Sequence, residues 1–151
     1  MDKLDPPRTF GVFKPVGHTV IAFKDEVSML GAIDRLAEVG VADESITTYS
    51  PQEMVGQTSD DLANAGALAS IGQELNLVKL HRQLAQDGSY FLVIETDDDE
   101  QAQRTADLAR EFGARMAQRY GRLMVEELID SGEDRQEFES PDRGLDDKNI
   151  T

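Results

Sequence analysis

This sequence contains no cysteine. The side chains that could do chemistry are therefore two histidines, a group of arginines and several acidic residues. Without thiols, the chain cannot form a disulfide, a thiolate metal site or a cysteine nucleophile. His18 and His81 are predicted to lie on different elements, so we expect no metal site and no cofactor. The simplest interpretation of each is a surface or strand-edge histidine. The alternative for His81 is an axial ligand of haem.

Five arginines between positions 104 and 122 form a basic concentration in an otherwise acidic chain. Arg115, Arg119 and Arg122 are the candidate anion-binding residues, and Arg115 and Arg119 share one face if their segment is extended. Guanidinium groups bind carboxylates and phosphates through paired hydrogen bonds, which favours an anion site here. Asp107 and Glu111 are interleaved with these arginines, so internal ion pairing is the alternative.

The acidic run Asp97-Asp98-Asp99-Glu100 has the oxygen ligands that calcium prefers. It lacks the glycine and the terminal glutamate of an EF-hand loop at the required offsets. Acidic residues also stabilise the first turn of a helix, and we interpret the run in that way. P-loop, GxGxxG, GxSxG and HExxH motifs are absent, so no reaction is assigned and a protein without a catalytic centre is favoured.

The composition excludes some partners. The 151 residues carry a formal charge of −15, which repels nucleic-acid backbones and anionic membrane surfaces. No apolar run approaches the roughly 18 residues of a transmembrane helix. The first residues lack the pattern of a signal peptide, so we expect a cytoplasmic protein.

Hydrophobic periodicity predicts strands over residues 18–23, 45–49 and 90–95, and a last strand within 114–128 that is broken near Gly121. Helices are predicted from Asp25 or Glu26 to Gly40, from about 58 to 86, and from 96 to Gly113, with a loop over 52–61. The first helix has a predicted apolar stripe at spacings typical of a helix: Val27, Leu30, Ile33, Leu36 and Ala37.

This order of elements is the split βαβ pattern of an α+β, ferredoxin-like sandwich, with an extra amphipathic helix between its halves. We expect a four-stranded antiparallel sheet with two helices on one face. A doubly wound parallel sheet is the alternative. Residues 17–130 form the predicted domain, 1–16 an irregular arm tethered by Phe10, Val12 and Phe13, and 131–151 an acidic tail that we expect to be disordered. The tail could also hold a docking motif around Phe138 and Leu145.

The predicted strands are apolar on both faces, so both faces of the sheet should be covered. The extra helix over residues 68–86 has a broad apolar arc, with one stripe of Leu68, Ile71, Leu75 and Val78 and a second of Leu77, Leu80 and Leu84. Either the whole arc packs on its own sheet, or part of it builds an interface. We expect the latter, with Leu77, Leu80 and Leu84 in a homo-oligomer, most simply a two-fold dimer.

Residues 32–40, AIDRLAEVG, followed by 43–47, DESIT, resemble the helix, terminal glycine and acidic step into a strand of the general stress (heat-induced stress) protein family of bacteria. A second resemblance runs from Gly88 to Ala114, with a strand, an acidic helix start and a closing Gly-Ala pair. Together the matches cover about 18–50 and 88–128. The segment between them departs from the family, whose members often have a Gly-rich apolar stretch there.

The resemblance implies a ferredoxin-like domain with a non-enzymatic, stress-associated role. We therefore expect an interaction or regulatory protein that acts as a homo-oligomer and meets protein partners through helix 68–86 or the acidic tail. Two alternatives remain open. One is a cofactor-binding or catalytic dimeric α+β barrel with a pocket between sheet and helix, and the other is a small-anion sensor that uses the arginine group.

Overall fold

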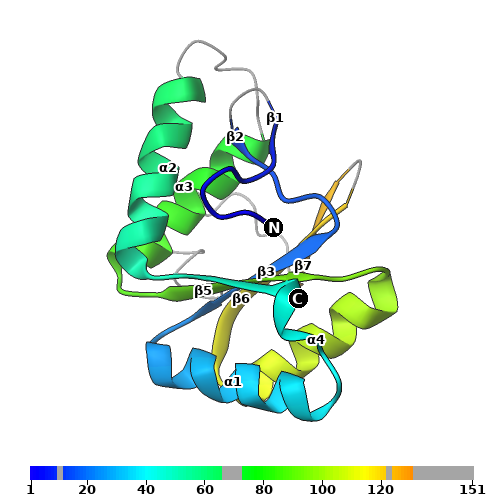
Figure 1. Cartoon of the computed structure of the whole chain (residues 1–151). Helices are drawn as coiled ribbons and strands as arrows, with labels where there is room; N and C mark the ends of the chain where they lie inside the picture. Colours follow the sequence, from blue (N-terminus) through cyan, green and yellow to red (C-terminus); the bar gives the residue numbers. More distant parts are fainter. Residues whose placement is uncertain (10–11, 66–72, 122–123, 131–151) are drawn as a thin grey trace, which may run out of the picture.

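The computed structural model describes residues 1–9, 12–65, 73–121 and 124–130. Its centre is a five-stranded antiparallel sheet in the order β4-β5-β3-β6-β7. These strands are Ile46–Tyr49, Tyr90–Glu95, His18–Phe23, Ala114–Tyr120 and Val125–Ile129. Two helices cover each face (Figure 1): α1 (Glu26–Glu38) and α4 (Asp99–Glu111) on one, α2 (Pro51–Ala65) and α3 (Gln73–Gln86) on the other.

The two halves of the fold are β3-α1-β4 and β5-α4-β6, and their strands interleave so that β3 and β5 lie side by side at the centre. This is the predicted ferredoxin-like α+β arrangement, and the antiparallel pairing excludes the doubly wound alternative. The chain leaves the predicted last strand near Gly121, as expected, but it then forms a fifth strand. After Gly121 the chain returns as β7, whose Val125 is paired with Tyr120.

The predicted loop over 52–61 is wrong, because these residues belong to α2. The helix begins with a reciprocal capping box: the Glu53 backbone N–H donates to Ser50 Oγ at 3.1 Å, and the Ser50 N–H donates to Glu53 Oε1 at 2.9 Å. Pro51 occupies the first helical position, where its missing N–H costs nothing. The expected helix start at 58–61 therefore lies inside a helix that is already formed.

The buried stripe of α2 explains why this helix is hard to recognise. Met54, Thr58 and Asp61 face the interior at helical spacing, but two of the three are polar. Thr58 satisfies its hydroxyl by donating to the Met54 carbonyl at 3.0 Å. Hydrophobic periodicity cannot detect a stripe that is made largely of polar residues.

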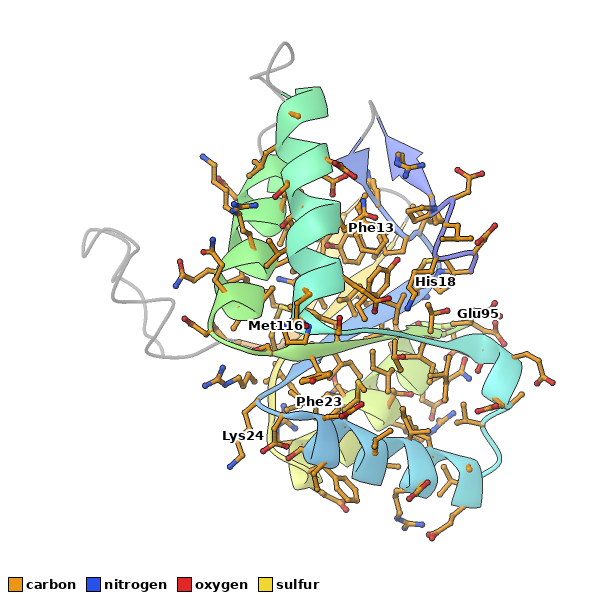
Figure 2. The ribbon with its side chains drawn as sticks, turned by 60° about the vertical axis from the view of Figure 1, so that its left-hand side comes forward. Phe13, His18, Phe23, Lys24, Glu95 and Met116 are labelled. Atoms are coloured by element: carbon orange, nitrogen blue, oxygen red, sulfur yellow. The ribbon has the colours of Figure 1, made fainter. Side chains whose placement is uncertain are left out.

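The sheet separates two hydrophobic cores, as its two apolar faces predict. Val20 and Ala22 belong to the core beneath α2 and α3, whereas Ile21 and Phe23 belong to the core beneath α1 and α4. Figure 2 shows Phe23 on the α1–α4 side of the sheet. The second face is thus covered within the chain by α2, α3 and the N-terminal arm (Figure 1).

The buried side of α1 differs from the predicted stripe. Met29, Ala32 and Leu36 are the buried residues, while Val27 is 80% exposed and Leu30 is 49% exposed. The helix has apolar residues on most of its circumference, so spacing alone allows more than one stripe. Two apolar side chains of its first turns consequently face solvent in the single chain.

The three interface candidates on α3 are placed mainly inside their own chain. Leu80 is 9% exposed and Leu84 is 2% exposed, and both belong to the core that includes Phe91. Leu77 is partly buried against the same core. These three side chains therefore pack on the sheet of their own chain. Leu68 and Ile71 lie outside the described residues, and the Leu75 side chain is not described.

The N-terminal arm is more ordered than predicted. It contains a short pairing between β1 (Arg8–Thr9) and β2 (Val12–Phe13). Phe13 is buried against Tyr49, with ring centroids 6.2 Å apart, which confirms it as a tether. Lys3 Nζ donates to the Thr48 carbonyl at 2.9 Å, so the arm also contacts the edge strand β4. Phe10 and the acidic tail lie outside the described residues.

Within the described ranges, no helix has both the length and the apolar character that crossing a bilayer requires.

Candidate functional site

A cleft of about 600 Å³ lies between the C-terminal end of α1 and α4. Its apolar lining includes Leu36, which is buried, and Val41 and Leu108, which pack against the core under these helices. Val39 adds a side chain that is 54% exposed. The cleft therefore has an apolar base that continues into the core, and we call it the α1–α4 cleft.

The end of α1 shapes one wall of the α1–α4 cleft. Gly40 adopts a positive φ of 94°, and the Val41 N–H donates to the Leu36 carbonyl at 3.0 Å. This is a Schellman-type ending, in which glycine takes the left-handed position at little cost. The reversal places Val39 and Val41 on the cleft lining.

The opposite wall is formed by α4, with lining residues from Gln101 to Glu111. Asp98 caps the helix by accepting the Gln101 N–H at 2.8 Å, and Gln101 Oε1 accepts the Asp97 N–H in return. The acidic run is therefore a helix start, as interpreted from the sequence. Asp97 and Gln101 both line the cleft, so the cap also supplies polar groups to it.

Charged side chains surround the apolar base of the α1–α4 cleft. Its lining contains four carboxylates and two guanidinium groups: Glu95, Asp97, Asp107, Glu111, Arg35 and Arg104. Both arginines already have acidic partners, since Arg35 contacts Glu38 at 3.1 Å and Arg104 contacts Glu100 at 3.4 Å. The electrostatic character of the cleft is consequently acidic.

Arg115 and Arg119, two of the candidate anion-binding arginines, do not converge. Arg115 and Arg119 lie four residues apart on β6, which separates their Cα atoms by about 13 Å. Arg115 donates to Ser89 Oγ at 3.2 Å, and Arg119 forms an ion pair with Asp99. Both guanidinium groups thus have partners within the chain, although neither partner is Asp107 or Glu111. Arg122 lies outside the described residues.

His81 is buried, which contradicts the expected surface or strand-edge position. It follows Val78 by three residues on the buried side of α3, and its side chain is only 1% exposed. Its Nε2 lies 3.1 Å from Gln118 Oε1, and its ring meets Phe91 edge to face at 5.9 Å. Because Nε2 is used by Gln118, this nitrogen does not fit an axial haem ligand. His18 is half-buried at the start of β3, with Nδ1 3.0 Å from the Val16 carbonyl.

Burial lowers the pKa of His81 to about 4, although the hydrogen bond to Gln118 acts in the opposite direction. We expect its NMR signals to remain those of a neutral imidazole until the pH approaches 4. Since the unfolded chain binds this proton more readily, the contribution of His81 to the free energy of unfolding should fall as the pH drops from about 6.5 toward 4. A titration midpoint near 6.5 would contradict the burial of His81.

Asp61 is a second buried ionisable group, between α2 and the N-terminal arm. Its carboxylate accepts a hydrogen bond from Gln57 Nε2 at 3.0 Å, and its other oxygen has no partner within the described residues. Burial raises the pKa of Asp61 to about 6, against the lowering effect of the Phe13 backbone N–H. Tyr49 is also affected by this environment: burial, Glu53 and Asp61 raise its pKa to about 12.

The residues that the structure describes contain no cluster of three histidine, aspartate or glutamate side chains arranged to hold a metal ion. His18 and His81 lie on β3 and α3, as the sequence predicts. No protein-family model, curated protein or solved structure matches the chain. The candidate site is therefore defined by its own geometry.

Sequence reasoning missed the α1–α4 cleft. Its lining comes from the end of α1 and the segment that follows it up to Ser45, from the end of β5, and from α4, and these parts are far apart in sequence. The available signal was local: an apolar pair on either side of Gly40 and an acidic helix start after β5. Only the sheet order brings these segments together.

Proposed function

We propose that this protein is a non-enzymatic, stress-associated interaction or regulatory protein that binds its partner in the α1–α4 cleft. The observation that carries the proposal is the cleft itself, with an apolar base that continues into the core and charged groups around it. Apolar concavities with a few polar groups are the usual form of recognition sites. The stress association rests on the resemblance of residues 18–50 and 88–128 to the general stress protein family.

The proposal is tested by filling the cleft. Val39→Trp adds a large ring to a half-exposed position of the lining, so it should remove a bound partner and leave the fold intact. Met124→Trp is the matched control, because Met124 is 62% exposed and does not line the cleft. Affinity capture from native lysate should recover a partner with the wild type and the control and lose it with Val39→Trp. Equal recovery with both variants would contradict the proposed site.

We also propose that the protein acts as a homo-oligomer. The support is the exposure of Val27 and Leu30 on α1, since solvent-exposed apolar groups that lie together mark interaction surfaces. A two-fold dimer would bury them against their copies in the second chain.

Light scattering tests this assembly. The wild type should have the mass of two chains at micromolar concentration, and Val27→Asp with Leu30→Asp should have the mass of one. Leu4→Asp, at a 93% exposed arm residue, is the control and should remain dimeric. A wild-type mass of one chain contradicts the assembly, and a dimeric double variant places the interface elsewhere.

A further inference from the structure

We propose that the occupant of the α1–α4 cleft is a basic peptide segment of a protein partner, carrying an apolar side chain between its lysines or arginines. This inference rests on the proposed function and names the chemistry of the partner. The surface to be matched consists of an apolar base, Leu36, Val41 and Leu108, beneath exposed carboxylates.

The charges around the cleft favour a cation. Asp107 and Glu111 lie one turn apart on the exposed side of α4, while Glu95 comes from the end of β5 and is 52% exposed. Carboxylates on two separate elements thus border one concavity. A cationic partner is attracted by the net negative charge of this border, whereas an anionic partner is repelled.

The arginines of the lining do not reverse this preference. Arg35 is paired with Glu38, and Arg104 is paired with Glu100. Each pair brings an additional carboxylate to the neighbourhood of the cleft, so neither guanidinium adds net positive charge there. Two other cations lie nearby: Arg110 contacts Asp107 at 2.9 Å, and the N-terminal ammonium of Met1 lies 4.0 Å from Glu95. Asp97 and Glu111 are the lining carboxylates left to a ligand.

The apolar base distinguishes a peptide from a simple cation. A polyamine or a lysine homopolymer satisfies the carboxylates but leaves the exposed parts of Val41 and Leu108 in water. A side chain such as leucine placed between basic residues removes this apolar surface from water as well, which is favourable at about 25 cal/mol per Å². The formal charge of −15 on the whole chain adds long-range attraction for such a segment.

The experiment measures binding of a fluorescent peptide of lysine and leucine by anisotropy. The comparison peptides replace every lysine by glutamate, or every leucine by lysine. The wild type should bind the lysine–leucine peptide at least roughly tenfold more tightly than either comparison peptide, and added salt should weaken this binding. Equal binding of the glutamate peptide would overturn the charge argument. Equal binding of the all-lysine peptide would overturn the role of the apolar base.

Variants localise the binding. Asp107→Lys with Glu111→Lys should weaken it roughly tenfold or more. The control Asp60→Lys with Asp87→Lys changes the total charge equally, at exposed positions in the other helical layer. Equal losses in the two variants would overturn the inference, because general attraction to an acidic protein would then explain the binding. Asp107→Asn with Glu111→Gln gives the same test without charge reversal and should show a smaller loss in the same direction.

The location of the binding site and the basic character of its partner are tested separately. If Val39→Trp removes the lysate partner but Asp107→Lys with Glu111→Lys does not, the cleft is a binding site and its partner is not basic. If neither variant affects the lysate partner, the proposed site itself is wrong.

Discussion

Replacing Leu80 and Leu84 with aspartate should unfold the protein rather than produce a folded chain of altered assembly. Both side chains are buried in the core between α3 and the sheet. Truncation of one buried leucine costs about 2–5 kcal/mol, and a buried charge adds to that cost. Two such changes approach or exceed the roughly 5–15 kcal/mol that stabilises a typical domain. Far-UV circular dichroism and urea denaturation at 25 °C would measure the loss.

Val27→Asp with Leu30→Asp is the matched control, because it also replaces two aliphatic residues with aspartate, at α1 positions that face solvent. It should keep the circular dichroism spectrum of the wild type. A variant with Leu80→Asp and Leu84→Asp that stays folded and loses only its assembly would contradict the packing of α3. It would also restore these two leucines as interface residues.

Asp61→Asn should stabilise the protein at neutral pH by up to roughly 3 kcal/mol, because it removes a buried negative charge. The pKa of Asp61 is raised from 3.8 to about 6 in the folded chain, so folding favours the protonated form. The contribution of Asp61 to the free energy of unfolding is therefore most favourable below about pH 4 and is lost as the pH rises through about 6. The variant is free of this loss, and its amide can still accept the hydrogen bond from Gln57.

Urea unfolding of both proteins between pH 4 and pH 8 measures the effect. The advantage of Asp61→Asn should be near zero at pH 4 and reach its full value above pH 7. Asp60→Asn, at the exposed neighbouring position, should show no such gain. If the difference in free energy of unfolding between Asp61→Asn and the wild type is the same at every pH, the pKa of Asp61 is not raised in the folded chain. That result would contradict the effect of burial on this carboxyl group.

Much of the fold could be predicted because its central strands and helix ends have local signals. The strands 18–23 and 90–95 are predicted with the bounds that the structure gives to β3 and β5. Gly40 and Gly113 follow the ends of α1 and α4 with positive φ, as expected of glycine at a helix end. The apolar character of both strand faces correctly requires two covered faces.

The errors have a common physical cause, because in each case several patterns are compatible with the same local sequence. The capping box around Ser50 was present, but the polar residues Thr58 and Asp61 at buried positions concealed the helix behind it. On α1, the alternative stripe of Met29, Ala32 and Leu36 is the one buried against the sheet. Tertiary packing decides between such alternatives.

The candidate site could not be predicted because none of its parts has a motif of its own. The α1–α4 cleft depends on the position of α1 beside α4, and this follows from the strand order. The arginine group shows that residues close in sequence need not form one site. Arg115 and Arg119 are close in sequence, yet an extended strand separates them and gives each a different partner.

The most direct test of the binding cleft is an NMR titration of ¹⁵N-labelled protein with the lysine–leucine peptide. We predict that the largest shifts in the amide signals fall on residues 39–42 and 97–108, which border the α1–α4 cleft from its two walls. Residues of α2 and α3, on the opposite face of the sheet, should change little. Shifts concentrated on α2 and α3, or spread evenly over the acidic surface, would contradict the account.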